Sequence, residues 1–380
     1  LVGIMAYKPI DILYLSSWYP NKYQPFVGNF VRRQAAMLAE THNVTVIHTV
    51  ARAEESGFNL EKNVEGNLTE YHVYHQRGKT LLAKRKMQRA ALNIAMAEIG
   101  NVDLLLTQIL LPKGLQFIDA MKNFDCPWIH IEQGSYFRSE IRKKWSIPQR
   151  IIIKWAVRNI DQIYAVSNFL KKDMKSVFPK KDIKIISNHV DPERFTYKPK
   201  QKRTHTKFLH VSTLDEATKN PKGILDACKL LKNQGETNFS LLIICDEDSS
   251  KWREYANELE LSDIITFEGA QEWDALPSFY HDADAFILNS VYETFSIVIA
   301  ESWSTGTPVI STPVGIAFDL PTNLGYQTEF GKPESLAHSM KQFIENKNSF
   351  DGIEIQKAAS KYSTSNVNEE LRTLIKMHVK

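Results

Sequence analysis

The fold can be inferred from one stretch of sequence, Asp284-Ala-Phe-Ile-Leu-Asn-Ser-Val-Tyr-Glu-Thr-Phe-Ser-Ile-Val-Ile-Ala-Glu-Ser-Trp-Ser-Thr-Gly-Thr-Pro-Val-Ile310. The apolar runs 285–288 and 308–310 predict two short strands, and the residues between them predict a loop and then a helix. Runs that are apolar throughout, rather than alternating, indicate strands that are buried on both faces by covering helices. The stretch is therefore typical of a βαβ unit in a parallel sheet.

The same alternation of strands and helices extends along most of the chain. Further buried strands are predicted at 12–15, 44–50, 104–106, 128–131, 163–166, 183–186, 208–211, 239–244 and 264–267, with amphipathic helices at 30–39, 79–99 and 148–160. We expect an α/β fold with two Rossmann-like doubly wound domains that face a central cleft. In such sheets the loops at the carboxyl ends of the strands form the ligand crevice.

The alternation is interrupted at 191–203, where two prolines and a run of charged residues leave no apolar period, which predicts a linker. We expect an N-terminal domain at 1–195 and a C-terminal domain at 206–362. The cleft between them would close about this linker. A last helix, at 363–380, is expected to pack back on the N-terminal domain or to cap the C-terminal one.

The composition excludes several classes of protein. Of 380 residues, 43% are apolar, and 47 Lys and Arg stand against 44 Asp and Glu, so the chain is neither disordered nor a strongly basic nucleic-acid binder. The three cysteines, Cys126, Cys228 and Cys245, form no C-x-x-C pair, which argues against a metal site and favours a reducing compartment. With no signal-peptide pattern and no apolar run of roughly 18 residues, a cytoplasmic location is expected.

Residues that suit an anionic ligand gather between the two strands of the quoted stretch. If a helix starts at about Thr294 as its N-cap, the free amides of Phe295 and Ser296 favour a group such as a diphosphate. Glu301 follows Glu293 by eight residues, or roughly 12 Å if all of them were helical. One carboxylate would lie beside the anion and the other deeper, ready to accept hydrogen bonds from hydroxyl groups. Equally, two helix glutamates can simply face solvent.

Five segments together carry a resemblance to a known family. Residues 290–308 resemble the E-x7-E region of the family-four glycosyltransferases of the GT-B fold. Residues 18–31 are similar to the family's first glycine loop, 166–170 to its valine-serine element, and 186–195 to its N-G-V-D-x-x-x-F element. Residues 210–227 are similar to a strand, a loop and a K-G-x-x-x-L-x-x-A-like helix. The resemblance implies a retaining glycosyltransferase with a UDP- or GDP-sugar as donor.

The resemblance also implies roles for individual residues. Glu293 would hold donor-sugar hydroxyls and Glu301 the ribose, while Gly28 would let the backbone approach the donor phosphate. Counting back from Ala227 assigns the phosphate-binding lysine to Lys219, with Lys222 as a rival. Cations and the amides of Thr294, Phe295 and Ser296 would replace a metal ion, and no D-x-D-like pair occurs in these loops.

Two positions depart from the family pattern. The family usually has an arginine shortly before the lysine, where this chain has Thr213, and a histidine where this chain has Gln133. A glutamine cannot titrate, but its amide can hydrogen-bond a sugar hydroxyl. His130 is expected on the same strand face as Glu132, away from Gln133. These departures keep open a non-catalytic sugar-nucleotide or glycan-binding protein, and a sugar-nucleotide epimerase of similar fold is a further alternative.

The small net charge of +3 averages two unlike halves. Up to Phe195 there are 28 basic and 18 acidic residues, and afterwards 19 basic and 26 acidic ones. The basic excess gathers at 79–89 and 138–158, the second with two tryptophans and the run 151–153. Such stretches suit either an anionic membrane surface or a solvated helix face with buried isoleucines. In the family the first domain receives the acceptor, so we expect a glycan or lipid-linked acceptor and a role in surface polysaccharide biosynthesis. Peripheral attachment to a membrane is also expected. Nucleic acid is not expected as a partner.

Overall fold

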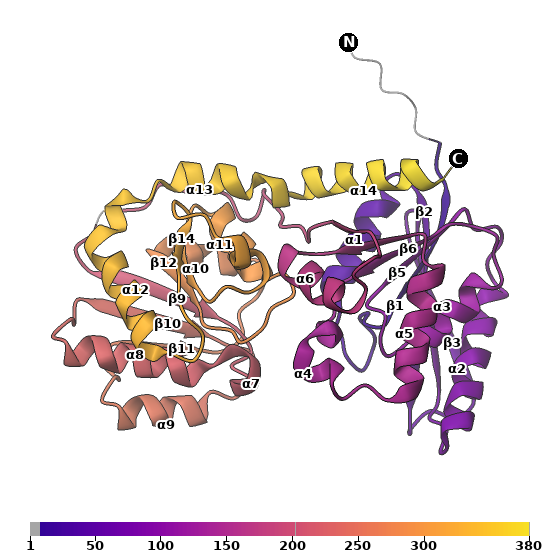
Figure 1. Cartoon of the computed structure of the whole chain (residues 1–380), viewed down its shortest axis with the longest axis horizontal. Coiled ribbons are helices and arrows are strands. Elements are labelled where there is room, and N and C mark those ends of the chain that lie inside the picture. The colour runs from indigo at the N-terminus through magenta and orange to yellow at the C-terminus, as the bar shows by residue number, and fades with distance from the viewer. Residues whose placement is uncertain (1–7, 202, 380) are drawn as a thin grey trace, which may run out of the picture. The chain divides into compact units, whose positions relative to one another are not determined.

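The computed structural model describes residues 8–201 and 203–379, and its contacts divide the chain into two compact units (Figure 1). The N-terminal unit comprises the chain up to Val166, Lys171–Ile186 and the residues from Asn368 onward. The C-terminal unit comprises Ser167–Leu170 and Ser187–Val367. Each unit is built around one sheet and is described by itself.

The N-terminal unit has an eight-stranded sheet in the order β3-β4-β2-β1-β5-β6-β7-β8, parallel except for the pairing of β3 with β4. The strands are β1 Asp11–Ser16, β2 Asn43–Arg52, β3 Phe58–Glu65, β4 Leu68–Gln76, β5 Leu104–Gln108, β6 Trp128–Glu132, β7 Gln162–Ala165 and β8 Ile183–Ile185. Because the strand order reverses between β1 and β5, the loops after these two strands diverge and leave room for a ligand.

The helical segments of this unit lie between its strands and at the C-terminal end of the chain. They are α1 Asn29–Ala39, α2 Leu81–Met96, α3 Gly114–Met121, η1 Ser135–Phe137, α4 Ser139–Arg142, α5 Ile147–Asn159, α6 Asn168–Val177 and α14 Thr364–His378. The start of α5 is fixed by a capping box, in which Ser146 and Gln149 satisfy each other's backbone amides. In α14 the side chains of Leu371, Leu374 and Ile375 are buried, and Asn368 donates to Glu40 at 3.2 Å.

The C-terminal unit has a six-stranded, fully parallel sheet in the order β11-β10-β9-β12-β13-β14. Its strands are β9 Thr206–Val211, β10 Phe239–Ile244, β11 Ile265–Glu268, β12 Ala285–Leu288, β13 Val309–Ser311 and β14 Gly325–Gln327. In sequence order this is the 3-2-1-4-5-6 arrangement of a Rossmann fold, with its switch point between β9 and β12.

The helical segments of this unit follow its strands in turn. They are α7 Glu216–Lys219, α8 Pro221–Asn233, α9 Ser250–Glu258, α10 Leu276–Asp282, α11 Ile297–Ser304, η2 Gly315–Asp319, α12 Pro333–Asn346, η3 Lys347–Ser349, α13 Gly352–Ala359 and η4 Ser360–Tyr362. One face of α8 and the strands beside it form an apolar core that includes Ile224, Leu231 and Phe239.

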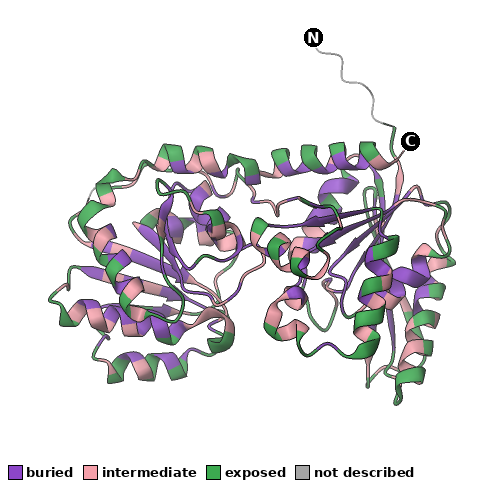
Figure 2. Ribbon diagram, in the orientation of Figure 1, coloured by how far each residue is buried: buried purple, intermediate pink, exposed green. Residues whose placement is uncertain are grey.

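The central strands are buried in both units, and the exposed residues lie mostly on the helices and loops (Figure 2). The predicted two-domain α/β fold with Rossmann-like parallel sheets is thus confirmed. Strand β3 was not predicted, because nearly every one of its residues is exposed and it carries no apolar pattern. Among the described residues no helix is both long and apolar enough to cross a bilayer.

The segment 191–203, expected to be a linker, bonds to the C-terminal unit at several of its described positions. Arg194 forms an ion pair with Asp274 at 3.0 Å, and Lys200 donates to the Tyr280 carbonyl at 2.9 Å. The chain passes from one unit to the other before this segment, between Ile186 and Ser187.

Candidate active site

The loops that follow β9 and β12 meet at the switch point of the C-terminal sheet. Val291, in the loop after β12, donates its amide to the carbonyl of Thr218 at 2.8 Å. Asn220, in a left-handed conformation, ends α7 and caps α8 through the amide of Gly223. These contacts fix Lys219, the last residue of α7, at the edge where a ligand of a Rossmann fold binds.

Lys219 and Glu293 form an ion pair across this switch point. The two side chains are only 21% and 15% exposed, and Ser290 donates its hydroxyl to the same carboxylate oxygen at 2.9 Å. The pair places one cation and one anion, both partly shielded from water, on adjacent loops. Such a pair can exchange partners, with the ammonium turning to a phosphate and the carboxylate accepting from a hydroxyl.

The rival lysine points elsewhere. Lys222 donates to Asp226 at 2.8 Å and to Tyr255 at 2.9 Å on the outer side of α8. The hydrogen bond to Asp226 is the main cause that raises the pKa of Lys222. The structure therefore brings Lys219, and not Lys222, to Glu293.

A buried histidine, which the sequence analysis did not single out, lies under the same loops. His210 of β9 contacts the carbonyl of Ile287 at 2.8 Å and the hydroxyl of Ser212 at 2.7 Å. A carbonyl can only accept, so Nδ1 carries the proton and Nε2 accepts from Ser212. Burial, reinforced by the charge of Lys219, lowers the pKa of His210 to about 4, so its ring is neutral at pH 7.

The predicted start of the next helix is wrong. Helix α11 begins at Ile297, and its N-cap is Ser296, with φ 73° and no side-chain cap bond, rather than Thr294. The carbonyls of Thr294 and Phe295 accept from Ser167 Oγ and from the amide of Ile316, so they are not available to a helix that starts earlier. The amides at the helix start that lack a partner within the helix are those of Ile297 and Val298, since Ile299 donates to the Ser296 carbonyl at 3.1 Å.

Two further predicted donor-binding residues are Glu301, which lies on α11, and Thr213, which follows β9. Glu301 is buried on α11 and accepts from the hydroxyl of Tyr280 at 3.0 Å. Thr213 lies in the loop after β9, next to Leu214, whose φ of 58° turns the chain. Glu301 is therefore fixed by protein contacts and does not face solvent, contrary to the alternative that both glutamates are surface residues.

In the N-terminal unit, Gly28 is the N-cap of α1 and has φ 76°. A Cβ atom at this position would lie 2.7 Å from the backbone carbon of Trp18, so only glycine fits. The loop after β1 thus passes very close to the start of α1. This contact between two backbone segments accounts for the glycine, and the role of Gly28 at a donor phosphate stays a prediction.

Gln133 follows β6 and is buried in a polar network. Its Nε2 donates to Gln108 Oε1 at 2.6 Å, while its Oε1 is buried without a hydrogen-bond partner. Glu132 accepts from the amides of Gln133 and Gly134 at 3.0 and 2.7 Å, and His130 donates to it at 3.2 Å. His130 therefore lies beside Glu132, as its strand position predicted. The Gln133 oxygen thus has an unused acceptor capacity, and its contact with a sugar hydroxyl stays a prediction.

Two family models match consecutive parts of the chain. The model described as Glycosyltransferase Family 4 matches residues 27–194, and the model described as Glycosyl transferases group 1 matches residues 193–365. The chain belongs to the family-four-like glycosyltransferases. A glycosyltransferase family model therefore matches most of each unit.

Relatives of this glycosyltransferase are distant. It is 26% identical to a glycogen synthase of Mycobacterium tuberculosis over 42% of the chain and 39% of that protein. It is also 26% identical to a lipopolysaccharide 1,6-galactosyltransferase of Escherichia coli over 40% of the chain and 42% of that protein. The matched region thus spans about two fifths of the length of these relatives. HepE of Anabaena, solved in complex with UDP, has the same fold, with a TM-score of 0.74 and 16% identity over 97% and 100% of the two chains.

The loop that carries Glu293 in this glycosyltransferase is held by a residue that sequence reasoning missed. Ser167 donates its hydroxyl to the carbonyl of Thr294 at 2.5 Å and accepts the amide of Leu170 at 3.1 Å. Asn168 donates to Asp319 at 2.8 Å. The valine-serine element contained the signal, but nothing in its spacing predicted a contact more than a hundred residues away.

A third missed residue is Lys113, which follows β5 at the switch point of the N-terminal sheet. Its amide donates to Ser17 Oγ at 3.0 Å and its ammonium donates to the Thr49 carbonyl at 2.8 Å. Burial lowers the pKa of Lys113 to about 7. A lysine after a predicted strand is common in sequences, so only the structure distinguishes this one.

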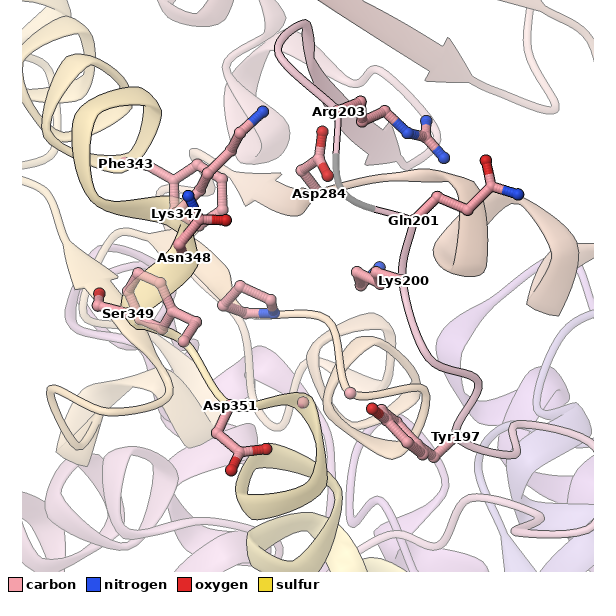
Figure 3. Close-up of a pocket in the computed structure, with 14 residues that line it drawn as sticks. Tyr197, Lys200, Gln201, Arg203, Asp284, Phe343, Lys347, Asn348, Ser349 and Asp351 are labelled. Atoms are coloured by element: carbon pink, nitrogen blue, oxygen red, sulfur yellow. The ribbon is translucent and has the colours of Figure 1, made fainter.

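The C-terminal unit also has a cavity of about 430 Å³ at the amino ends of β12 and β13, on the opposite edge of the sheet from Lys219 (Figure 3). Its cations, Lys200, Arg203 and Lys347, donate to backbone carbonyls of α10 and of the chain before β9. They fasten segments of the unit together, so this cavity is not part of the site.

No group of three or more His, Cys, Asp or Glu side chains that could hold a metal ion occurs within residues 8–201 and 203–379. The three cysteines are unpaired as disulfides, and two of them, Cys228 and Cys245, are buried. The groups available for an anionic ligand at the switch point are an ammonium and backbone amides.

Proposed function

We propose that this protein is a retaining glycosyltransferase that moves a sugar from a UDP- or GDP-sugar to a glycan or lipid-linked acceptor in surface polysaccharide biosynthesis. The observation that carries the proposal is the Lys219–Glu293 pair at the switch point of the C-terminal sheet. One group suits a diphosphate and the other suits sugar hydroxyls, and both stand on loops at the ligand edge of a Rossmann fold.

The leaving diphosphate is the group with the greatest need for stabilisation in glycosyl transfer, because it gains negative charge as the glycosidic bond breaks. The Lys219 ammonium and the amides at the start of α11 would bind that charge. Glu293 would orient the donor sugar through its hydroxyls. Glu301, fixed by Tyr280, would accept from the ribose hydroxyls.

Groups of the N-terminal unit would complete the chemistry. Gly28 would bring backbone amides to the phosphates, since no side chain separates its loop from α1. The buried Oε1 of Gln133 would accept a hydroxyl of the transferred sugar. Because an amide does not titrate, this contact would orient the sugar without moving a proton.

The comparisons support the donor and acceptor classes. HepE of Anabaena shares the fold and binds UDP, and one relative acts on lipopolysaccharide. We further propose that the transfer needs no metal ion, that the protein works in the cytoplasm at the inner face of the cell membrane, and that nucleic acid is not a partner.

The proposal is tested by turnover of the donor. Purified protein is incubated with UDP- and GDP-sugars without acceptor, and free UDP or GDP is measured with and without EDTA. We expect slow donor hydrolysis that EDTA leaves unchanged and that Glu293→Gln abolishes. Binding of a nucleotide-sugar without any hydrolysis, with or without candidate acceptors, would instead favour a non-catalytic binding protein.

The alternative function, a sugar-nucleotide epimerase, is based on the same fold. The reaction products distinguish it from a glycosyltransferase. An epimerase converts one nucleotide-sugar into another and releases no nucleotide. Chromatography of the same reaction mixtures distinguishes a new nucleotide-sugar from free UDP or GDP.

A further inference from the structure

Five large apolar side chains are exposed on segments that follow strands of the N-terminal sheet. We call them the apolar edge; they are Phe26, Leu81, Leu82, Ile147 and Ile151, which are 83%, 77%, 84%, 74% and 62% exposed. Exposed apolar surface that gathers in one region of a fold marks an interaction site more often than a packing defect.

The topology explains why these residues share an edge. In a parallel sheet the helix that follows a strand begins at that strand's carboxyl end. Phe26 lies in the loop between β1 and α1, Leu81 and Leu82 open α2 after β4, and Ile147 opens α5 after β6. Helices α2, α3 and α5 are also neighbours in the unit (Figure 1). All five side chains therefore lie at the same edge of the sheet as Gly28 and Gln133.

The core does not need these side chains. Helix α5 buries Ile153, Ala156 and Val157, and α2 buries its later residues, Ala91, Leu92 and Ala95. Ile147 and Ile151, four residues apart, lie on one outward face of α5. The interpretation in which the isoleucines are buried thus holds for Ile153 but not for Ile151.

Exposed basic residues lie in or beside the same segments, α2 and α5, as four of the five apolar side chains. They are Lys79, Lys86, Arg89, Lys143, Lys144, Arg150 and Lys154. Within 79–89 and 138–158 the one acidic residue is Glu140, and Arg138 neutralises it in an ion pair at 2.8 Å. Apolar side chains accompanied by cations match the boundary between acyl chains and anionic headgroups.

We propose that the apolar edge is an interfacial surface that inserts into a bilayer containing anionic lipid and sets the ligand edge of the N-terminal unit against the membrane. The inference rests on the proposed function and narrows it, because an acceptor that reaches this edge from a membrane is lipid-linked rather than a free glycan. Phe26, Leu81 and Ile147 insert, and the lysines and arginines of the same segments contact the headgroups.

The test measures binding to large unilamellar vesicles by co-sedimentation. Vesicles of phosphatidylcholine alone are compared with vesicles that contain roughly one third phosphatidylglycerol. We expect binding to the anionic vesicles only, and a fall of about tenfold or more when salt is raised from about 0.05 M to about 0.5 M.

Matched variants assign the binding to its surface. Ile147→Ser with Ile151→Ser, and Leu81→Ser with Leu82→Ser, should each weaken vesicle binding by about tenfold or more. Val64→Ser is the apolar control, because Val64 is 58% exposed at the far end of β3, at the opposite edge of the same sheet. Lys143→Glu with Lys144→Glu should also weaken binding, whereas Lys180→Glu, at the opposite edge, should not.

Three outcomes would overturn the inference: no binding to anionic vesicles, binding that the edge variants leave unchanged, or a dimer that only the edge variants dissociate. In the last case the apolar edge is an interface between two copies of the chain, which sedimentation velocity reveals. None of these results depends on donor turnover. The edge variants should hydrolyse the donor at the wild-type rate, so failure here and failure of the proposed function are distinguishable.

Discussion

Lys219 and Lys222 carry the same charge three residues apart, yet they meet different partners. Lys219 ends the short helix α7 and reaches Glu293, whereas Lys222 lies in the first turn of α8 and reaches Asp226. Residue spacing alone could not decide which lysine binds phosphate, because the left-handed Asn220 between them changes the chain direction. A single backbone conformation thus separates a candidate catalytic residue from a surface one.

This difference makes a direct prediction for the two lysines. Lys219→Met should lower kcat by about a hundredfold or more, because the cation that faces the leaving diphosphate is lost. Lys222→Met is the matched control and should leave kcat within about twofold, since its ion pair is exposed. The measurement is the steady-state rate of nucleotide release from the donor. Equal losses in the two variants would contradict the assignment.

His210 predicts a pH dependence of stability. The folded-state pKa of about 4 lies below the ordinary value of 6.5, so between these values the unfolded chain binds more protons. Stability should therefore fall as the pH falls from 6.5 to about 4, by roughly 3 kcal/mol from this residue. In urea titrations across this range, His210→Asn should flatten the fall, while His338→Asn, at an exposed position, should not. An unchanged slope in His210→Asn would show that the ring is not buried in its neutral form.

At the scale of single elements, the start of α11 shows what the sequence could not predict. Thr294 is a good N-cap by residue type, but its carbonyl is used by Ser167, far away in the chain. The helix consequently starts at Ile297, after the left-handed Ser296. Local propensity predicted that a helix exists here; the long-range hydrogen bonds determine where it begins.

Gly315 makes that start possible. A Cβ atom there would lie 2.3 Å from the Phe295 carbonyl oxygen and 2.5 Å from Ser296 Oγ. Gly315→Ala should destabilise the protein by about 2–4 kcal/mol, because it adds overpacking to the cost of a left-handed residue. Gly331→Ala isolates the backbone cost, since Gly331 also has positive φ but has nothing within 4 Å of the new Cβ. Thermal unfolding should show a clearly larger loss for Gly315→Ala, and equal losses would contradict the packing argument.

Helix α14 allows a similar comparison. Leu371 is fully buried on it, whereas Met377 on the same helix is 66% exposed. Leu371→Ala should cost about 2–5 kcal/mol of the free energy of unfolding through the cavity that it leaves. Met377→Ala should change this free energy by less than about 0.5 kcal/mol. If chemical denaturation gave the same midpoint for both variants, the helix would not be packed as the structure has it.

For the whole molecule, the apolar runs predicted both parallel sheets, because strands buried on both faces are apolar at nearly every position. They did not predict β3, whose residues are almost all exposed, nor β4 and β14, which have no continuous apolar run. They also did not reveal that residues of 191–203 bond to the C-terminal unit, because these bonds, such as Lys200 to the Tyr280 carbonyl and Arg194 to Asp274, join single side chains to partners far along the chain. Such bonds leave no pattern in a sequence.

The candidate site was predictable to a different degree in each part. Glu293 and Lys219 were found from motif positions, and the structure brings them together. His210 and Ser167 were not found, since each bonds to a backbone carbonyl in a distant segment, that of Ile287 and that of Thr294. The charge difference between the two halves could be counted from the sequence. Only the structure showed that apolar side chains such as Leu81 and Ile147 are exposed in the same basic segments.

The central claim, a nucleotide-sugar site at the Lys219–Glu293 pair, is tested most directly by thermal shift with UDP, GDP, ADP and their sugars at about 1 mM. At least one nucleotide-sugar should raise the melting temperature of the wild type, and Lys219→Met and Glu293→Gln should reduce that rise while Lys222→Met keeps it. If no nucleotide-sugar shifted the melting temperature of the folded wild-type protein, or if the shift were the same in all three variants, the claim would be contradicted.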